Sequence, residues 1–492
     1  MSWTSPDRIA VPSREDTVVR SASQVIGGPL GRYAVVAAKG WRRAAAGLAA
    51  VSAVPMALGV AERAHCIDQG WSTPDQFWHA CFSDLPATYQ DAGLSAGIGA
   101  FLAGGTGAPS PAHPPLTAFV MSLLASVVPS GPMDSQLRFY FALWAVLGAV
   151  LIALTTWWTT ASVRGFPIRA AHVALSPVVL LTVVVAPDVL GVALAAAAMY
   201  LWSRERLVLS GVLLGLAISA RTYPIVILVA LLLVSLRAGR VRAWGRTAGA
   251  AILTFAVVLA VLGAVNADAA VLAYRGWLEA GAGFGSPWLL PQLAGHALPP
   301  VAVTILCAAG WVAALCCGAV FALASRRRPG VAEVALVILG IVVVTGKSFP
   351  VQASLWLVPL VALVGMRWRD HLVWAAAEAL HFVAVWLYLA GASVADRGLP
   401  AGWYALFLLL RLGAVGWLVQ RTWAVARARH QVFVDDGPPE PTRQPGADPV
   451  ADPGADLDRD LDGDMGDVGD EEHDELAGPL RGARDHLIVR FG

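Results

Sequence analysis

FSDLPATYQDAGLSAGIGAFLAGGTGAPSPAHPPL, residues 82–116, lies between two apolar segments, residues 44–62 and 137–160. The stretch carries two carboxylates, Asp84 and Asp91, and is too rich in glycine and proline to be another membrane-spanning helix. Ionisable groups beside a lipid phase usually have a function, because the bilayer makes them costly. The stretch therefore predicts a polar loop between spanning helices, with a candidate site at its carboxylates.

The composition is that of a polytopic membrane protein. Hydrophobic residues make up 57% of the 492 and charged residues 14%, whereas soluble domains have about 25% charged residues. The net charge of +1 combines an arginine-bearing apolar body with a very acidic end, so it indicates no nucleic-acid partner. Lysine occurs only at Lys39 and Lys347, which makes the second, deep in the chain, a candidate functional residue.

Apolar runs of spanning length predict an all-α fold with about 12 transmembrane helices. Placing the arginine clusters in the cytoplasm puts both termini inside and makes residues 63–136 a long first extracytoplasmic loop with juxtamembrane helices. Residues 114–130 are expected to lie on the outer surface, since every basic cluster then falls on one side. The predicted spans are 44–62, 137–160, 170–185, 188–203, 206–220, 223–236, 247–265, 299–324, 331–346, 351–367, 371–390 and 403–424.

The chain divides into three regions by composition. Residues 1–43 are polar and arginine-rich, without the pattern of a cleaved signal, and are expected to be a cytoplasmic leader. Residues 44–424 are the transmembrane domain. Residues 425–492 are predicted to be an acidic, disordered cytoplasmic tail, because aspartate, proline and glycine replace apolar periodicity. A partial calcium-loop pattern at 458–463 lacks the required glutamate at its twelfth position, so calcium binding is not expected there.

Two cysteines, Cys66 and Cys81, flank a short polar stretch of the predicted outer loop. In an extracytoplasmic setting they can form a disulfide. The alternative is a pair of unpaired, buried thiols.

The predicted topology places a set of polar side chains on the outer face, so any chemistry is expected there. Asp84 and Asp91 can equally cap or solvate a surface helix, and interfacial arginine, lysine and tyrosine can be anchors. Glu378 and His381 lie one helical turn apart and face the same side. They are interpreted as a buried structural hydrogen bond, the alternative being a site within the membrane, and the same two interpretations apply to Arg411. The outer set is Asp84, Asp91, His113, Asp188, Arg221, Tyr223 and Lys347.

The order DLPATYQDAGL, from Asp84, and then HPPL, from His113, resembles the GT-C superfamily of integral-membrane glycosyltransferases. It is similar in particular to the polyprenyl-phosphate-mannose-dependent, family 87-like mannosyltransferases of actinobacteria. SPVVLLTVVVAPD (176–188), RTYP (221–224) and KSFPVQASLWLVP (347–359) also resemble stretches of that group. The resemblance implies a GT-C-like catalytic domain over 44–424, in the plasma membrane. It implies transfer of a sugar, most often mannose, from a polyprenyl-phosphate donor to a glycolipid or glycan acceptor on the extracytoplasmic face.

By this resemblance Asp84 stands at the position of the catalytic base, and Asp188 at that of a second acid that binds a metal or orients the acceptor. Inverting transfer needs one carboxylate to take the proton of the acceptor hydroxyl, and cations to neutralise the departing phosphate. Arg221 and Lys347 suit the phosphate.

Three further residues have open roles. Tyr223 is a candidate for the same phosphate, and His113 and Asp91 are candidates for the acceptor side. The sequence names no certain cofactor and leaves a divalent metal open. The alternative function is a lipid or sugar transporter, or a flippase, whose outer polar residues bind without chemistry.

Overall fold

The computed structural model describes residues 16–31, 40–105, 107–394, 396–435 and 475–489, and the description that follows is confined to them. These residues form helices joined by loops and contain no strand. Six helical segments are long and apolar enough to cross a membrane: α2 and α3 together (Trp41–Val51 and Ala53–Glu62), α9 (Met133–Ser162), α15 (Val241–Val265), α18 (Pro300–Ala324), α21 (Trp368–Ser393) and the first part of α22 (Ala401–Asp435).

Shorter apolar helices pack among the long ones. They are α12 (Val189–Ser203), α13 (Leu207–Ala220), α14 (Ile225–Arg237), α19 (Val331–Val344) and α20 (Val358–Val364), with the broken segment η2 (Pro167–Ala170), α10 (Ala171–Ala174) and α11 (Pro177–Thr182). Six of the twelve predicted spans coincide with long helices and six with this shorter set. The all-α membrane class is therefore confirmed, while the count of twelve crossings stays a prediction.

Two predicted spans, 170–185 and 351–367, are not uninterrupted helices. The first is divided into η2, α10 and α11, and the second into η4 (Val351–Trp356) and α20. Pro177 and Pro359 each stand in the first turn of a new helix. Proline has no amide hydrogen to donate to the preceding turn, so it begins a helix more readily than it continues one.

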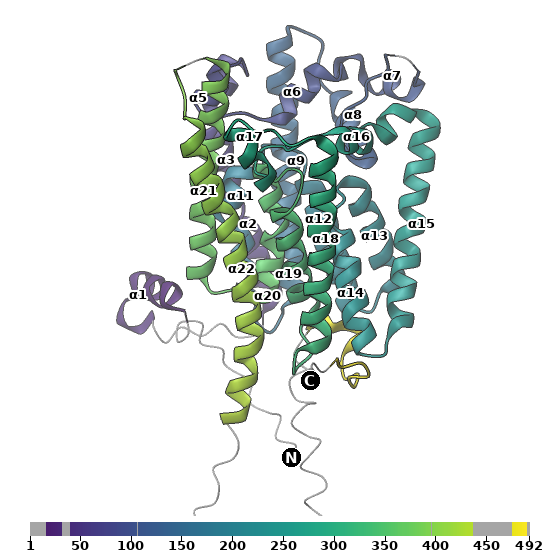
Figure 1. Cartoon of the computed structure of the whole chain (residues 1–492), viewed down its shortest axis with the longest axis vertical. Helices are drawn as coiled ribbons and strands as arrows, with labels where there is room; N and C mark the ends of the chain where they lie inside the picture. The colour runs from purple at the N-terminus through teal and green to yellow at the C-terminus, as the bar shows by residue number, and fades with distance from the viewer. Residues whose placement is uncertain (1–15, 32–39, 106, 395, 436–474, 490–492) are drawn as a thin grey trace, which may run out of the picture.

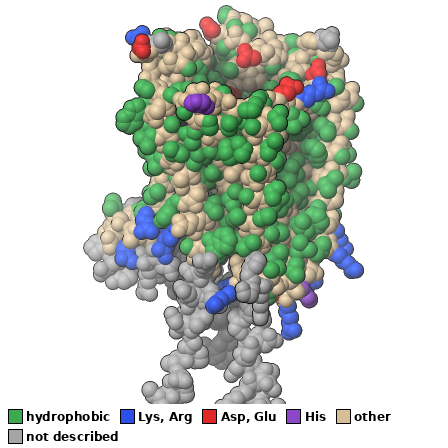
Figure 2. All heavy atoms as spheres, in the orientation of Figure 1, with side chains coloured by type: hydrophobic (Ala, Val, Ile, Leu, Met, Phe, Trp, Pro, Cys, Tyr) green, Lys and Arg blue, Asp and Glu red, His purple; other side chains and the backbone are tan. Residues whose placement is uncertain are grey.

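The bundle has two chemically different ends (Figure 1). One, which we call the loop end, carries α4 (Ala64–Gln69), α5 (Asp75–Trp78), α6 (Asp84–Asp91), η1 (Leu94–Ala96), α7 (Gly97–Ala103), α8 (Pro115–Ala125), α16 (Ala267–Glu279), η3 (Pro287–Leu289) and α17 (Leu290–Leu293). The other, the arginine end, holds the junction of α14 and α15 and the C-terminal segment. Figure 2 shows a wide hydrophobic band between them, with Asp and Glu at the loop end and most Lys and Arg at the opposite end of the face in view.

Helix α8 contains 11 residues, a length of about 16 Å, which is too short to cross a bilayer alone. It packs against α7, α13, α15 and α16 at the loop end. This length agrees with the prediction that residues 114–130 do not span the membrane.

Close helix packing depends on glycine at one contact in particular. A Cβ atom at Gly211 of α13 would lie 2.3 Å from the carbonyl oxygen of Thr247 in α15, and one at Gly215 would lie 2.5 Å from that of Ala251. Small residues four apart allow two helix backbones to approach closely where lipid offers no hydrophobic driving force. The pair therefore places α13 firmly against α15.

The structure describes both ends of the region 425–492, which is predicted to be a disordered tail. Helix α22 continues to Asp435, and residues 475–489 begin with η5 (Glu475–Leu480). Residues 436–474 lie outside the described part. The leader likewise contains a helix, α1 (Thr17–Gly31). Leu480 is buried in the main core, so a short apolar run that follows the acidic stretch packs against the helices.

The C-terminal segment is held by a buried ion pair. Arg237, the last residue of α14, is fully buried, and its Nε donates to Asp485 Oδ2 at 2.7 Å. Its Nη1 also donates to the carbonyl oxygens of Ala322 and Ser325 at 2.9 Å each. The backbone amide of His486 donates to the Arg237 carbonyl at 2.7 Å. One guanidinium thus joins α14, the end of α18 and the C-terminal segment.

We predict that Asp485→Asn lowers the stability of the purified protein by about 3 kcal/mol, because removal of one partner of a buried ion pair leaves the other charge uncompensated. The measurement is the apparent unfolding temperature in detergent. Glu205→Gln, which neutralises an exposed acid at the same end, is the matched control and should leave that temperature unchanged. Equal melting of the two variants would contradict the role of the pair.

Candidate active site

The loop that carries Asp84 is fastened to the turn that carries Asp188. Ser83 Oγ donates to the carbonyl oxygen of Val184 at 2.8 Å, and the Asp84 amide donates to that of Val185 at 2.7 Å. Ser83 Oγ also accepts from the Leu85 amide and so caps α6. The first turn of α6 and the start of α12 are therefore brought together although about a hundred residues separate them.

Asp188 is only 2% exposed, and both of its carboxylate oxygens are paired. Trp356 Nε1 donates to Oδ1 at 2.7 Å, and Arg221 Nη2 donates to Oδ2 at 2.5 Å. One helical turn after Asp188, a Cβ atom at Gly191 would lie 3.0 Å from the Arg221 Cβ. Glycine at this position thus leaves room for the arginine to reach the carboxylate.

Arg221 joins this pair to His113. Its Nη1 lies 3.3 Å from His113 Nδ1, and Thr117 Oγ1 of α8 donates to the carbonyl oxygen of Ala220 at 2.8 Å. Burial and the Arg221 charge lower the pKa of His113 to about 3. The imidazole is therefore neutral, and its Nδ1 accepts from the guanidinium while Nε2 carries the proton.

Asp84 lies at the edge of this group and is half-buried. Gln352 Nε2 donates to its Oδ2 at 3.4 Å. Burial and the negative charge of Asp188 raise the pKa of Asp84 to about 7, against the opposing effect of Arg221. A carboxyl group with a pKa near the working pH can take up and release a proton, which is the requirement for a general base.

Tyr223 packs against Trp356, the tryptophan that donates to Asp188. Its ring stacks on that of Trp356, with centroids 4.9 Å apart and planes 9° from parallel, and burial raises the pKa of its hydroxyl. Five segments distant in sequence thus meet at one place: residues 83–84, 113–117, 188–191, 221–223 and 352–356.

Residues 112–349 match the family model of Glycosyltransferase family 87. The chain is a glycosyltransferase family 87-like membrane protein. No curated protein and no solved structure matches it. The family match indicates a glycosyltransferase, and it covers His113, Asp188 and Arg221 but begins after Asp84. The hydrogen bonds of Ser83 and Asp84 to residues 184 and 185 hold that carboxylate beside the matched region in the fold.

Lys347, which is predicted to hold the donor phosphate, is engaged by the backbone of another helix. It is 2% exposed, and its ammonium donates to the carbonyl oxygens of Trp277, Leu278 and Ala280 at 2.9, 3.1 and 2.9 Å. An ammonium has three hydrogens to donate, so this side chain is saturated by the last turn of α16. In this structure Lys347 therefore caps the end of α16, and a role in donor binding stays a prediction.

Asp91 is also separated from the group. It is exposed at the far end of α6, whereas Asp84 opens the same helix. The structure leaves Asp91 outside the candidate site.

The sequence analysis missed two partners of the acids. Gln352 and Trp356, four residues apart in η4, contact Asp84 and Asp188 respectively. The sequence predicts neither as a site residue, because Gln352 is neutral and a tryptophan near a membrane interface needs no other explanation than anchoring. A signal was available, because both lie in KSFPVQASLWLVP, the stretch already singled out near Lys347.

Two structural groups support the glycosyltransferase site. The disulfide between Cys66 and Cys81 closes the loop that immediately precedes Asp84, and a loop of this length is stabilised by about 3 kcal/mol. Arg411 donates to Glu378 at 2.8 Å, to Ser354 Oγ at 2.8 Å and to the Phe349 carbonyl. This buried group, in which Arg411 rather than His381 pairs with Glu378, holds the segment that contains Gln352.

We predict that Asp188→Asn moves the titration of Asp84 to lower pH, toward the usual range of aspartate. The substitution removes a negative charge that raises the pKa and frees the Arg221 charge that lowers it. The titration is measured as the infrared band of the protonated carboxyl group, assigned by its loss in Asp84→Asn. A shift to higher pH would contradict the assigned electrostatics.

We predict that Lys347→Met lowers the unfolding free energy by about 2 kcal/mol, because buried carbonyl oxygens lose their donor. Arg275→Met removes an exposed cation from α16, the helix that Lys347 caps, and should have no such effect on thermal unfolding. An unchanged unfolding temperature in Lys347→Met, together with weaker binding of a lipid phosphate, would return Lys347 to the phosphate site.

Proposed function

We propose that this glycosyltransferase moves a hexose, mannose, from a polyprenyl-phosphate donor to a hydroxyl group of a glycolipid or glycan acceptor. The reaction takes place on the extracytoplasmic face of the plasma membrane. The observation that carries the proposal is Asp84, a half-buried carboxyl group with its pKa raised to about 7, set beside a buried acid and an arginine.

Asp84 acts as the general base. It takes the proton of the acceptor hydroxyl as that oxygen bonds to the anomeric carbon, and the bond from that carbon to the donor phosphate oxygen breaks with its electron pair leaving on phosphate. Attack and departure occur on opposite faces of the sugar, so one base suffices and the anomeric configuration inverts. Gln352, bonded to Asp84 Oδ2, orients the carboxylate.

Arg221 neutralises the departing phosphate. Its side chain is 14% exposed and makes one bond through each Nη atom, to His113 and Asp188, while its Nε makes no hydrogen bond within the described residues. Each Nη atom therefore keeps a second hydrogen for phosphate oxygens. Asp188, which Trp356 holds in turn, and His113 fix the plane of the guanidinium. Such preorganised charges are strongest where water is excluded, as beside a bilayer.

Two groups complete the proposed subsites. The neutral imidazole of His113 offers its Nε2 hydrogen to the acceptor side. Tyr223 lies beneath the phosphate position, on the ring of Trp356. No step of this mechanism requires a metal.

The surroundings suit a donor that arrives through the lipid. Elements at the loop end expose large apolar side chains, as expected where a polyprenyl chain lies against protein: Leu102, Leu123, Val127, Leu278 and Phe284. Arginine at the opposite end of the bundle supports a cytoplasmic location for that end. Both termini then lie in the cytoplasm, and the disulfide at the loop end agrees with an oxidising compartment.

We predict that Asp84→Asn reduces mannose transfer from polyprenyl-phosphate-mannose by at least about 100-fold, the usual contribution of a general base. Transfer is measured with labelled donor and the purified protein in nanodiscs. Asp134→Asn, which neutralises an exposed acid at the same end, is the control and keeps wild-type activity. The wild-type kcat/KM should rise with pH and level off above about 7, because only the ionised carboxylate accepts a proton.

Retention of transfer by Asp84→Asn would contradict the role of the base. A protein that moves labelled lipid across the bilayer and forms no glycosidic product would instead be the carrier or flippase.

A further inference from the structure

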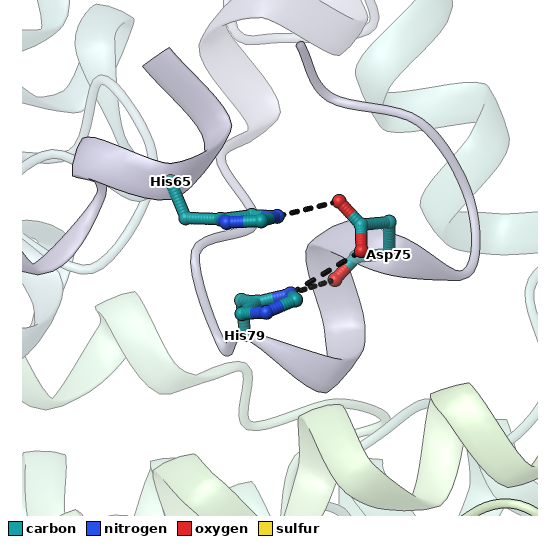
Figure 3. A group of neighbouring side chains, drawn as sticks. All are labelled: His65, Asp75 and His79. Atoms are coloured by element: carbon teal, nitrogen blue, oxygen red, sulfur yellow. Dashed lines mark hydrogen bonds and ion pairs between the residues drawn. The ribbon is translucent and has the colours of Figure 1, made fainter. Parts of the chain in front are cut away.

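Three metal-ligating side chains meet at the loop end, outside the glycosyltransferase site (Figure 3). His65 Nε2 lies 2.6 Å from Asp75 Oδ2, and His79 Nδ1 lies 3.3 Å from Asp75 Oδ1. The two imidazole rings stack with centroids 3.5 Å apart and planes 15° from parallel. Both rings therefore present a nitrogen to Asp75, as Figure 3 shows. The Nδ1 atom of His79 also lies 3.1 Å from the main-chain carbonyl oxygen of Asp75.

The backbone holds these three residues in place. His65 belongs to α4 and adjoins Cys66, while Asp75 opens α5 and His79 follows that helix, two residues before Cys81. The disulfide between the cysteines therefore joins the segments that carry His65 and His79. The ligand atoms are thus brought together by covalent structure and need not be gathered by an ion.

Contacts with the rest of the bundle fix α5. Trp78 Nε1 donates to the Arg397 carbonyl oxygen at 2.8 Å, and Phe77 stacks on Trp386 of α21 with centroids 6.1 Å apart. The helix that supplies Asp75 is therefore anchored on a long helix of the bundle.

The ligand atoms are within reach of one small tetrahedral cation once the stacked rings turn their nitrogen lone pairs toward it. One ligand atom from each residue lies within 4.8 Å of the others. Zinc bonds nitrogen and oxygen at about 2.0–2.2 Å, which places two ligands of one tetrahedral ion about 3.3–3.5 Å apart. The side chains are 33%, 33% and 46% exposed, so an ion can enter from solvent and a water molecule can complete the coordination.

We propose that His65, Asp75 and His79 bind one Zn²⁺ ion through two imidazole nitrogens and one carboxylate oxygen, with water as the fourth ligand. Imidazole favours zinc and its transition-metal neighbours, whereas calcium and magnesium prefer all-oxygen sites. The ion ties α4 to α5 in the segment that leads, through Cys81, to Asp84. This site is independent of the proposed transfer reaction, since none of its ligands contacts the Asp84 group.

The test is zinc binding by the whole protein in nanodiscs, stripped with chelator and titrated with Zn²⁺ alone. Wild type should bind one ion per chain, measured by elemental analysis after desalting, and the double variant His65→Gln, His79→Gln should lose it. His296→Gln removes an exposed histidine elsewhere at the loop end and should keep it. Asp188→Asn should also keep it, which separates this site from the glycosyltransferase acids.

A second measurement uses the wild-type protein and so does not depend on the folding of variants. Zn²⁺ should protect His65 and His79, but not His296, from diethylpyrocarbonate, as read by mass spectrometry of the peptides. Failure of wild type to bind zinc, retention of the ion by the double variant, loss of it in Asp188→Asn, or equal modification of His65 and His79 with and without Zn²⁺ would each overturn the proposal.

Discussion

The ion pair between Asp188 and Arg221 is the contact on which the rest of the site depends. A buried ion pair costs more than it returns unless its remaining polar atoms are also bonded. Trp356 satisfies the second oxygen of Asp188, and His113 takes a second donor of the arginine. These bonds draw together the α8, α12, α13 and η4 segments. The charge of the pair then acts on the half-buried Asp84, whose pKa reflects both members.

Part of this arrangement could be predicted from the sequence because membranes impose simple rules. Apolar length revealed the helices, and arginine distribution placed Asp84, Asp188 and Arg221 on one face. Those rules do not predict the contacts of Lys347, because its ammonium donates to backbone carbonyl oxygens of another helix, which residue type does not reveal. The breaks within two predicted spans have a related cause: Pro177 and Pro359 interrupt apolar runs that hydropathy reads as continuous.

The same limit explains Gln352 and the C-terminal segment. A neutral glutamine in an apolar run carries no charge signal, although its amide meets Asp84. Residues 475–489 hold short apolar runs directly after an acidic stretch. Leu480 and Asp485 contact a core and a buried arginine that lie far away in sequence. Asp84 itself lies ahead of the region that matches family 87, so the family pattern alone does not reach the carboxylate with the raised pKa.

The short helices beside the site have a consequence for the membrane itself. Helices α12, α13 and α14 contain 15, 14 and 13 residues and span about 20–22 Å, against a hydrocarbon core of about 30 Å. Such hydrophobic mismatch is relieved by local thinning of the bilayer. Thinning on this side of the molecule would bring lipid headgroups toward the loop end, where Asp84 lies. We therefore expect bilayer thickness, set by acyl-chain length, to affect how close this carboxyl group lies to the headgroups.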